Sequence, residues 1–275
     1  MGVSGRVAWV RWAVRPDSRW ETQPAKSSPT TLATSATAMA TNTATFMPTR
    51  RPPRTSGGTP FSSATRKVAA PAARRLPCGT MSRLPYLNRD QLDDAGRAVW
   101  DGLTESRGQR IVNDEGGLVG PFNAWLYAPG VGGHAGALGA TIRFESSLDP
   151  RLLELAIIVV AAHWKAEYEW WAHARLAREH GVADATVDAI GRGEKPALEA
   201  ADEVAVYTFA RELVVSGRVQ DATYAAAVEH LGYRGVVELM STCGYYTLVS
   251  FNLNTFEVPL PPGVAANWPE PERTR

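Results

Sequence analysis

The stretch that decides the fold is residues 149–181, which read DPRLLELAIIVVAAHWKAEYEWWAHARLAREHG. It opens on Asp149, a residue type that caps helices well, and on Pro150, which suits the first helical position because the N–H that it lacks has no partner there. Apolar residues then surround the helix axis up to Trp164, as is typical of a helix buried inside a bundle. A second helix follows, and Gly181 suits the left-handed residue at its end. The stretch therefore predicts two consecutive core helices.

The sequence after Met81 continues the helical periodicity. Apolar residues recur at spacings of three and four, for example at Val206, Phe209 and Ala210. Capping and glycine signals predict further helices from Asn88 to about Ser106, from Pro129 to about Phe144, from Asp184 to near Gly191, from about Leu198 to Ser216, from Asp221 to Leu231 and from Arg234 to Thr255. In the second of these, close backbone approach is expected at Gly132, Gly133, Gly136 and Gly139. We therefore expect an all-α fold, a bundle of about seven to eight helices.

The first eighty residues have a different composition. Residues 1–80 carry 12 Lys and Arg against 2 Asp and Glu, a net charge of +10, whereas the remaining 195 residues carry 17 against 26, or −9. Between Ser27 and Thr49, 18 of 23 residues are Ser, Thr, Ala or Pro, too few apolar side chains to offset the entropy lost on ordering. We expect a disordered extension over residues 1–80, a folded domain over residues 81–262 and a disordered tail over residues 263–275. We expect Met81 to be the true start of the protein, with residues 1–80 as extra translated sequence. A transit peptide or a nucleic-acid contact is the alternative for the extension.

Length, cysteine content and hydropathy exclude several classes of protein. With 275 residues, 44% of them hydrophobic, the chain is too large for a disulfide-stapled mini-protein. Its two cysteines, Cys78 and Cys243, form no CxxC motif and no disulfide framework. The longest apolar run, residues 155–164, is about half of the ~20 residues that a membrane-spanning helix needs. We expect a cytoplasmic protein with no membrane or nucleic-acid partner.

Three polar residues in the deciding stretch are candidates for catalysis. Glu154 lies inside an otherwise apolar helix, where a carboxylate needs either a hydrogen-bonding partner or a raised pKa. In the next helix Ala166, Glu169 and His173 occupy positions i, i+3 and i+7 and therefore share one face. A carboxylate and an imidazole one turn apart can act as an acid/base pair.

Each candidate also has a structural interpretation. Glu154 can be bonded to a helix N-terminus or to Arg151, and Glu169 with His173 can be a partly exposed helical pair. His163 lies about half a turn from Glu154 and should point away from it. A metal held by Glu154, Glu169 and His173 has no recognisable signature, and we expect none. Cys243 has no neighbouring His or Lys and should be inert.

The sequence resembles the carboxymuconolactone decarboxylase family, which shares the AhpD-like helical fold with the alkylhydroperoxidases. The resemblance is carried by Glu154-Leu-Ala-Ile-Ile-Val-Val, by Glu167-Tyr-Glu-Trp-Trp-Ala-His173 and by Gly181-Val182, and it extends over roughly residues 84–262. In the peroxidase branch a CxxC precedes the histidine by seven and four residues. Here those positions hold Ala166 and Glu169, so no thiolate is available at this site for peroxidase chemistry.

The resemblance therefore implies the decarboxylase branch: a lyase without cofactor or metal, acting on a small carboxylate or lactone, for example in the degradation of aromatic compounds. His173 would be the general acid/base, with Glu154 and Glu169 orienting it or its substrate. A non-catalytic small-molecule-binding or scaffold protein with the same fold is the second hypothesis, and thiol peroxidase activity through Cys243 is the third. The family also implies a homo-oligomer, a trimer or hexamer, and the Gly/Ala-rich helix near residues 130–140 carries more apolar surface than one small bundle can bury.

The composition of residues 1–80 leads to a prediction about stability. Because this segment lacks core-forming periodicity, its removal should leave the melting temperature and the oligomeric state unchanged. Calorimetry and light scattering on chains starting at Met1 and at Met81 provide the comparison. A shorter chain that unfolds or dissociates would contradict the expectation.

Overall fold

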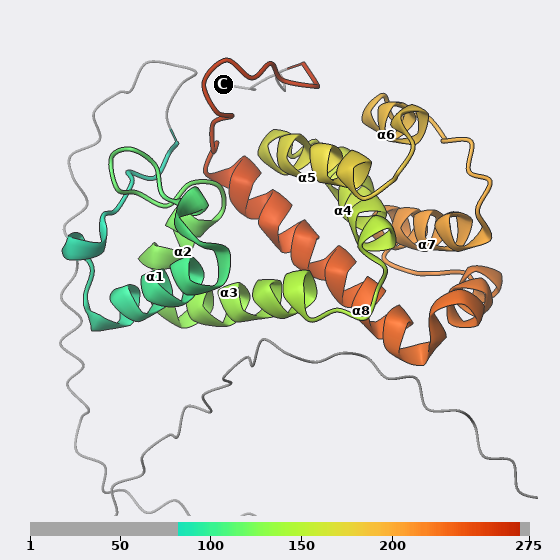
Figure 1. The fold of residues 1–275 in the computed structure, drawn as a ribbon, viewed down its shortest axis with the longest axis horizontal. Coiled ribbons are helices and arrows are strands. Elements are labelled where there is room, and N and C mark those ends of the chain that lie inside the picture. Colours follow the sequence, from blue (N-terminus) through green and yellow to red (C-terminus); the bar gives the residue numbers. More distant parts are fainter. Residues whose placement is uncertain (1–81, 270–275) are drawn as a thin grey trace, which may run out of the picture. The chain divides into compact units, whose positions relative to one another are not determined.

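The computed structural model describes residues 82–269, and the predicted extension at residues 1–80 lies outside this range. Within it the chain is all-α, as predicted, with two isolated bridges and no strand (Figure 1). The eight α-helices are α1 (Asp94–Arg107), α2 (Phe122–Tyr127), α3 (Pro129–Phe144), α4 (Pro150–Trp164), α5 (Glu167–Glu179), α6 (Asp184–Gly191), α7 (Ala201–Ser216) and α8 (Asp221–Thr255). Two single-turn 3-10 helices, η1 (Arg89–Gln91) and η2 (Gln109–Ile111), flank α1. None of the helices described is long and apolar enough to cross a membrane.

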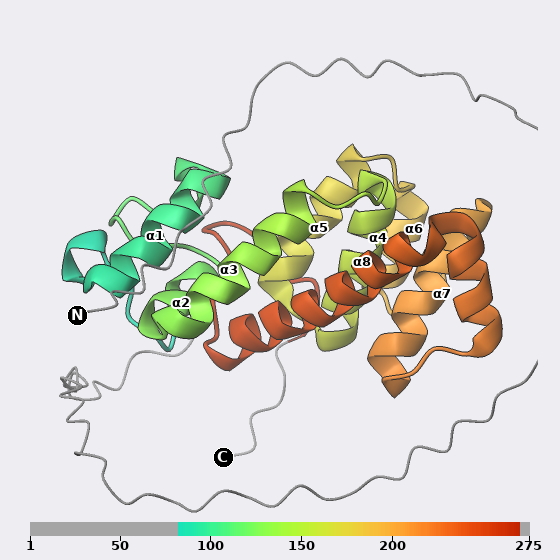
Figure 2. The same cartoon turned by 90° about the horizontal axis from the view of Figure 1, so that it is seen from below.

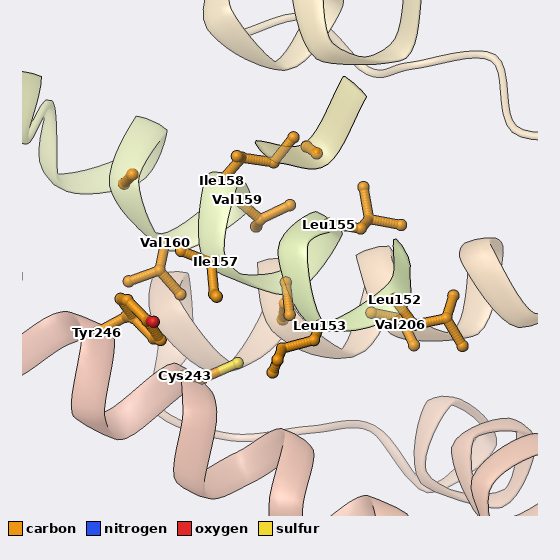
Figure 3. Packing of buried hydrophobic residues seen from close by; sticks show 14 of the residues in the cluster. Leu152, Leu153, Leu155, Ile157, Ile158, Val159, Val160, Val206, Cys243 and Tyr246 are labelled. Carbon is orange, nitrogen blue, oxygen red and sulfur yellow. The ribbon is translucent and has the colours of Figure 1, made fainter. Parts of the chain in front are cut away.

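Helix α4 is the centre of the main hydrophobic core. Every residue from Leu152 to Ala161 is buried, and α4 packs against α5, α7 and α8. Figure 3 shows Leu153 and Val160 on the side of α4 that faces Cys243 and Tyr246 of α8. Burying each large apolar side chain contributes about 1.5–3 kcal/mol, so α4 supplies much of the stability of the core.

Asp149 and Pro150 begin helix α4 as predicted from the sequence. The Asp149 carboxylate accepts the Arg151 N–H at 2.8 Å, and Pro150 occupies the first turn. At the other end Lys165 closes the helix in a left-handed conformation, with φ of 48°. This turn leads directly into α5, so the two halves of the deciding stretch lie against each other.

Helix boundaries differ from the sequence prediction at two N-termini. The segment after Asn88 forms η1 first, and α1 begins at Asp94, where the Asp93 side chain accepts the Gly96 N–H at 2.8 Å. Helix α7 begins at Ala201 instead of about Leu198. The break predicted near Gly232 is present: this residue has φ of 66° inside α8, whose second part lies beside α3 (Figure 2).

A second hydrophobic cluster joins α1, α2 and α3. It is built on Trp100, Leu103, Leu118 and Trp125. Helix α3 can approach its neighbours closely because several positions carry no side chain. A Cβ on Gly132 would lie 2.2 Å from the backbone oxygen of Trp125, while Gly133, which we expected to allow close approach as well, has only ordinary packing space.

The C-terminal segment contacts the domain beyond residue 262. The backbone N–H groups of Asn267 and Trp268 donate to the Glu167 carboxylate at 2.8 and 2.7 Å, and the Trp268 ring meets Trp170 with centroids 5.3 Å apart. The expectation of a disordered tail from residue 263 therefore does not hold for residues 263–269. The proline-rich composition gives no indication of this docking, which depends on an acceptor about one hundred residues earlier in the chain.

Two neighbouring glycines of α3 lead to a matched prediction. Gly132→Ala should destabilise the protein by about 1–3 kcal/mol, because the new methyl group meets rigid backbone. Gly133→Ala should be neutral or stabilise by up to about 1 kcal/mol, because alanine favours the helix and the nearest atom would lie at 3.6 Å. Urea unfolding of both variants tests this, and equal stabilities would show that the close approach is not a constraint.

Candidate active site

The three predicted candidates meet at the contact between α4 and α5. The Nδ1 atom of His173 lies 2.7 Å from a carboxylate oxygen of Glu154, and its Nε2 atom lies 3.0 Å from a carboxylate oxygen of Glu169. Glu154 is fully buried, and Glu169 and His173 are almost so. The imidazole is thus held between two carboxylates from different helices.

This geometry determines the charge of the imidazole. Since each ring nitrogen faces an acceptor, both nitrogens carry a proton and the ring is an imidazolium. Burial alone would lower the pKa of His173, but the charge of Glu169 and the hydrogen bonds to both carboxylates outweigh it and raise the pKa to about 9. Burial acts in the opposite direction on Glu154, whose pKa is nevertheless lowered by the bond to His173 and by the charges of His173 and Arg143. The cluster is therefore ionised at neutral pH.

Arg143 of α3 completes the cluster and was not predicted from the sequence. Its guanidinium forms an ion pair with the second carboxylate oxygen of Glu154. The partner considered from the sequence, Arg151, instead pairs with Asp202 and Glu203 at the start of α7. No local pattern distinguishes the two arginines, because the choice depends on how α3 and α7 pack around α4.

A cavity of about 320 Å³ opens beside this cluster. Glu169 and His173 line it, whereas Glu154 lies behind them. The other lining residues are cationic, aromatic or aliphatic, apart from one glycine: Arg107, Arg110, Ile111, Val119, Pro121, Phe122, Gly139, Arg143, Phe144, Tyr168, Trp171, Ala172, Arg175, Leu176, Tyr245, Tyr246 and Val249. Four arginines against one carboxylate make the cavity suited to an anionic ligand.

Two tyrosines of α8 form the wall next to the histidine. The Tyr246 ring meets His173 edge to face with centroids 5.0 Å apart, and Tyr245 lies 5.4 Å from Tyr246 in the same way. Burial raises the pKa of Tyr245 to about 12 and that of Tyr246 well above its usual range, so both are neutral phenols. Gly139 makes room for this wall, because a Cβ there would lie 2.1 Å from the Tyr245 hydroxyl. Neither tyrosine was predicted from the sequence, where the signal is a Tyr-Tyr pair on an otherwise apolar helix.

The remaining candidates lie away from the cluster. His163 points away from Glu154, as expected, and its Nδ1 lies 3.3 Å from Arg211 of α7. Cys243 is 1% exposed, and burial raises its pKa to about 12, so it is an unreactive core residue. Ala166, at a position where the peroxidases have cysteine, is fully buried before the first turn of α5. Among residues 82–269 no three His, Cys, Asp or Glu side chains are arranged to hold a metal ion.

The raised pKa of His173 predicts a pH-dependent stability. In the unfolded chain this pKa has its ordinary value of 6.5, and in the folded protein it is about 9. The stabilisation from the imidazolium is therefore complete below pH 6.5 and is lost as the pH rises through 9, by about 3 kcal/mol in total. Guanidinium unfolding between pH 6 and 10 should show this loss for the wild type and not for His173→Gln. The same pH dependence in both proteins would contradict the assignment.

One protein-family model matches the part of the chain that contains this cluster. Residues 132–212 match the model of the carboxymuconolactone decarboxylase family, a range that contains Arg143, Glu154, Glu169 and His173. No curated protein sequence matches the chain significantly.

One solved structure supports the fold, and two others have lower similarity. The AhpD core of an uncharacterized peroxidase-related protein from Ralstonia eutropha JMP134 is similar over 67% of this chain and 94% of its own, with 16% identity and a TM-score of 0.54. The debrominase Bmp8 has 14% identity, coverages of 64% and 91% and a TM-score of 0.49. An AhpD-type protein of unknown function from Agrobacterium tumefaciens has 13% identity, coverages of 52% and 98% and a TM-score of 0.46. The chain therefore has the AhpD-like helical fold, and its residues 132–212 match the model of the carboxymuconolactone decarboxylase family.

Proposed function

We propose that this protein is a lyase of the carboxymuconolactone decarboxylase type, which acts on a small unsaturated carboxylate or lactone by acid/base chemistry. The observation that carries the proposal is the His173 imidazolium, held between Glu154 and Glu169 at the wall of an arginine-rich cavity. A protonated histidine next to an anion-binding cavity suits a reaction in which a substrate anion must take up a proton.

The proposed reaction exchanges CO₂ for a proton. The bond between the substrate and its departing carboxylate breaks, CO₂ leaves, and the electron pair passes into a conjugated lactone carbonyl. The resulting enolate takes a proton on carbon from the cluster, and a proton from water restores the imidazolium. The neutral Tyr246 phenol and Arg143, which line the cavity beside the cluster, stabilise the negative charge that spreads onto the carbonyl oxygen.

The two carboxylates and the imidazole of the cluster differ in how they face the cavity. Glu154 has no face on the cavity and is ion-paired with Arg143, so it acts by holding and charging the imidazole. Glu169 both accepts from Nε2 of His173 and lines the cavity. The proton therefore passes from His173 to the substrate by way of Glu169 or after a small displacement of its carboxylate.

The structure favours this function over the thiol peroxidase alternative. Cys243 is buried among apolar side chains and its raised pKa keeps it a thiol, whereas peroxide reduction needs an accessible thiolate. A non-catalytic binding or scaffold protein is the second candidate, since the same cavity can hold an anion without converting it.

We also propose a homo-oligomer, a trimer or hexamer, built on helices α3 and α8. Both helices expose large apolar side chains, which in a monomer would face water. These residues are Val131, Leu138 and Phe144 of α3, and Tyr224, Tyr233, Val237, Met240, Leu248 and Phe251 of α8. The cytoplasmic location and the absence of a nucleic-acid partner stay predictions of the sequence.

Turnover measurements on a panel of unsaturated lactone carboxylates that includes carboxymuconolactone test the proposed function. We expect release of CO₂ by the wild type and a loss of about 10²–10⁴-fold in kcat/KM for His173→Gln. His163→Gln is the matched control, because His163 lies on the far side of α4 and should retain full activity.

Two outcomes would contradict the proposal. Activity of His173→Gln equal to that of the wild type would remove the assigned acid. A wild type that binds members of the panel and converts none would favour the binding or scaffold protein.

A further inference from the structure

We infer that Arg107 and Arg110 form a subsite for a second, non-reacting anionic group of the substrate. The inference rests on the proposed function, since it takes the cavity beside His173 to be the substrate site. It adds two specificity-determining residues, contributed by the end of α1 and by η2, which precede the segment that matches the family model.

Two of the four cavity arginines have a carboxylate partner within residues 82–269, and the other two have none. Arg143 pairs with Glu154, and Arg175 pairs with Glu179. No carboxylate within residues 82–269 forms an ion pair with Arg107 or Arg110. The positive charge that an incoming anion would neutralise is therefore concentrated at these two residues.

Arg107 is held rigidly in place. It is half-buried, its guanidinium lies 4.9 Å from the centroid of the Phe122 ring, and it donates to the Ser106 hydroxyl at 2.7 Å and to the Gly136 carbonyl at 3.4 Å. All of these partners are neutral. Burial and the neighbouring Arg110 charge lower the pKa of Arg107, which agrees with two like charges sharing one site. A carboxylate or another small anion would relieve this repulsion.

The subsite is separate from the proton-donating cluster. Arg107 interacts with Tyr245, Tyr245 meets the ring of Tyr246 at 5.4 Å, and Tyr246 meets His173 at 5.0 Å. Two tyrosine rings thus stand between the arginine and the imidazolium. Arg107 therefore reaches the acid only through this chain of contacts, and neither Arg107 nor Arg110 forms an ion pair or hydrogen bond with Glu154, Glu169 or His173.

The chemistry of decarboxylation indicates which group binds there. A strong ion pair to the departing carboxylate stabilises the ground state more than the transition state and slows the loss of CO₂. The arginine pair is therefore suited to a group that stays charged throughout the reaction. We assign it to a second carboxylate, at the opposite end of an unsaturated ligand whose planar part packs among the aromatic residues of the cavity.

Equilibrium binding of two isosteric probes tests the subsite without turnover. Cinnamate carries one carboxylate on a planar unsaturated body, and cinnamamide is its neutral counterpart. By calorimetry the wild type should bind cinnamate more tightly than the amide, with an affinity that falls as salt rises. Arg107→Gln should weaken cinnamate binding about tenfold, as loss of a charge-assisted bond does, and leave amide binding unchanged.

Three further variants test whether the charge and shape of the cavity arginines cause the change in cinnamate affinity. Arg110→Gln should also weaken cinnamate binding, and Arg107→Lys, which keeps the charge and loses the planar fork, should fall between the wild type and Arg107→Gln. Arg97→Gln is the charge-matched control, because Arg97 lies on α1 outside the cavity and pairs with Asp94. It should bind cinnamate within about twofold of the wild type.

The outcomes separate this inference from the proposed function. Equal wild-type affinities for cinnamate and cinnamamide, or unchanged cinnamate binding by Arg107→Gln and Arg110→Gln, would overturn the subsite whatever His173→Gln does to turnover. Weakened binding in both arginine variants together with unimpaired turnover by His173→Gln would keep the subsite and remove the assigned acid.

Discussion

The buried charge of Glu154 is the constraint on which the site depends. A carboxylate at the centre of an apolar helix would be strongly unfavourable alone, and it is tolerated because two cations, Arg143 and His173, meet its two oxygens. These partners come from α3 and α5. Satisfying one charge therefore ties three helices together at the point where the cavity opens.

The same constraint gives His173 its chemical character. An isolated buried histidine would be neutral, whereas this one is charged because a second carboxylate, Glu169, occupies its other side. The two positions that hold cysteines in the peroxidase branch are Ala166 and Glu169 here. These two replacements remove both thiols and place a carboxylate beside Nε2 of His173.

The cavity lies where the two hydrophobic clusters of the domain meet. Helices α5 and α8 contribute His173, Glu169 and the two tyrosines, while α1, η2 and the start of α2 contribute Arg107, Arg110 and Phe122. The close approach of α3 to α8 at Gly139 positions Tyr245 between them. The His173 cluster and the two arginines without a carboxylate partner thus come from different parts of the chain.

The sequence by itself determined the helical class, most of the helix boundaries and the pairing of Glu169 with His173, because periodicity, caps and i,i+4 spacing are local properties. It also marked Glu154 as a carboxylate that needs partners. Which partners it has was decided only by the tertiary structure: Arg143 and Arg151 look alike in the sequence, and the packing of α3 and α7 assigns one to the site and the other to a different ion pair. The tyrosine wall, the arginine pair and the docking of Trp268 were decided in the same way, since each joins residues far apart in the chain, and no local pattern records such a contact.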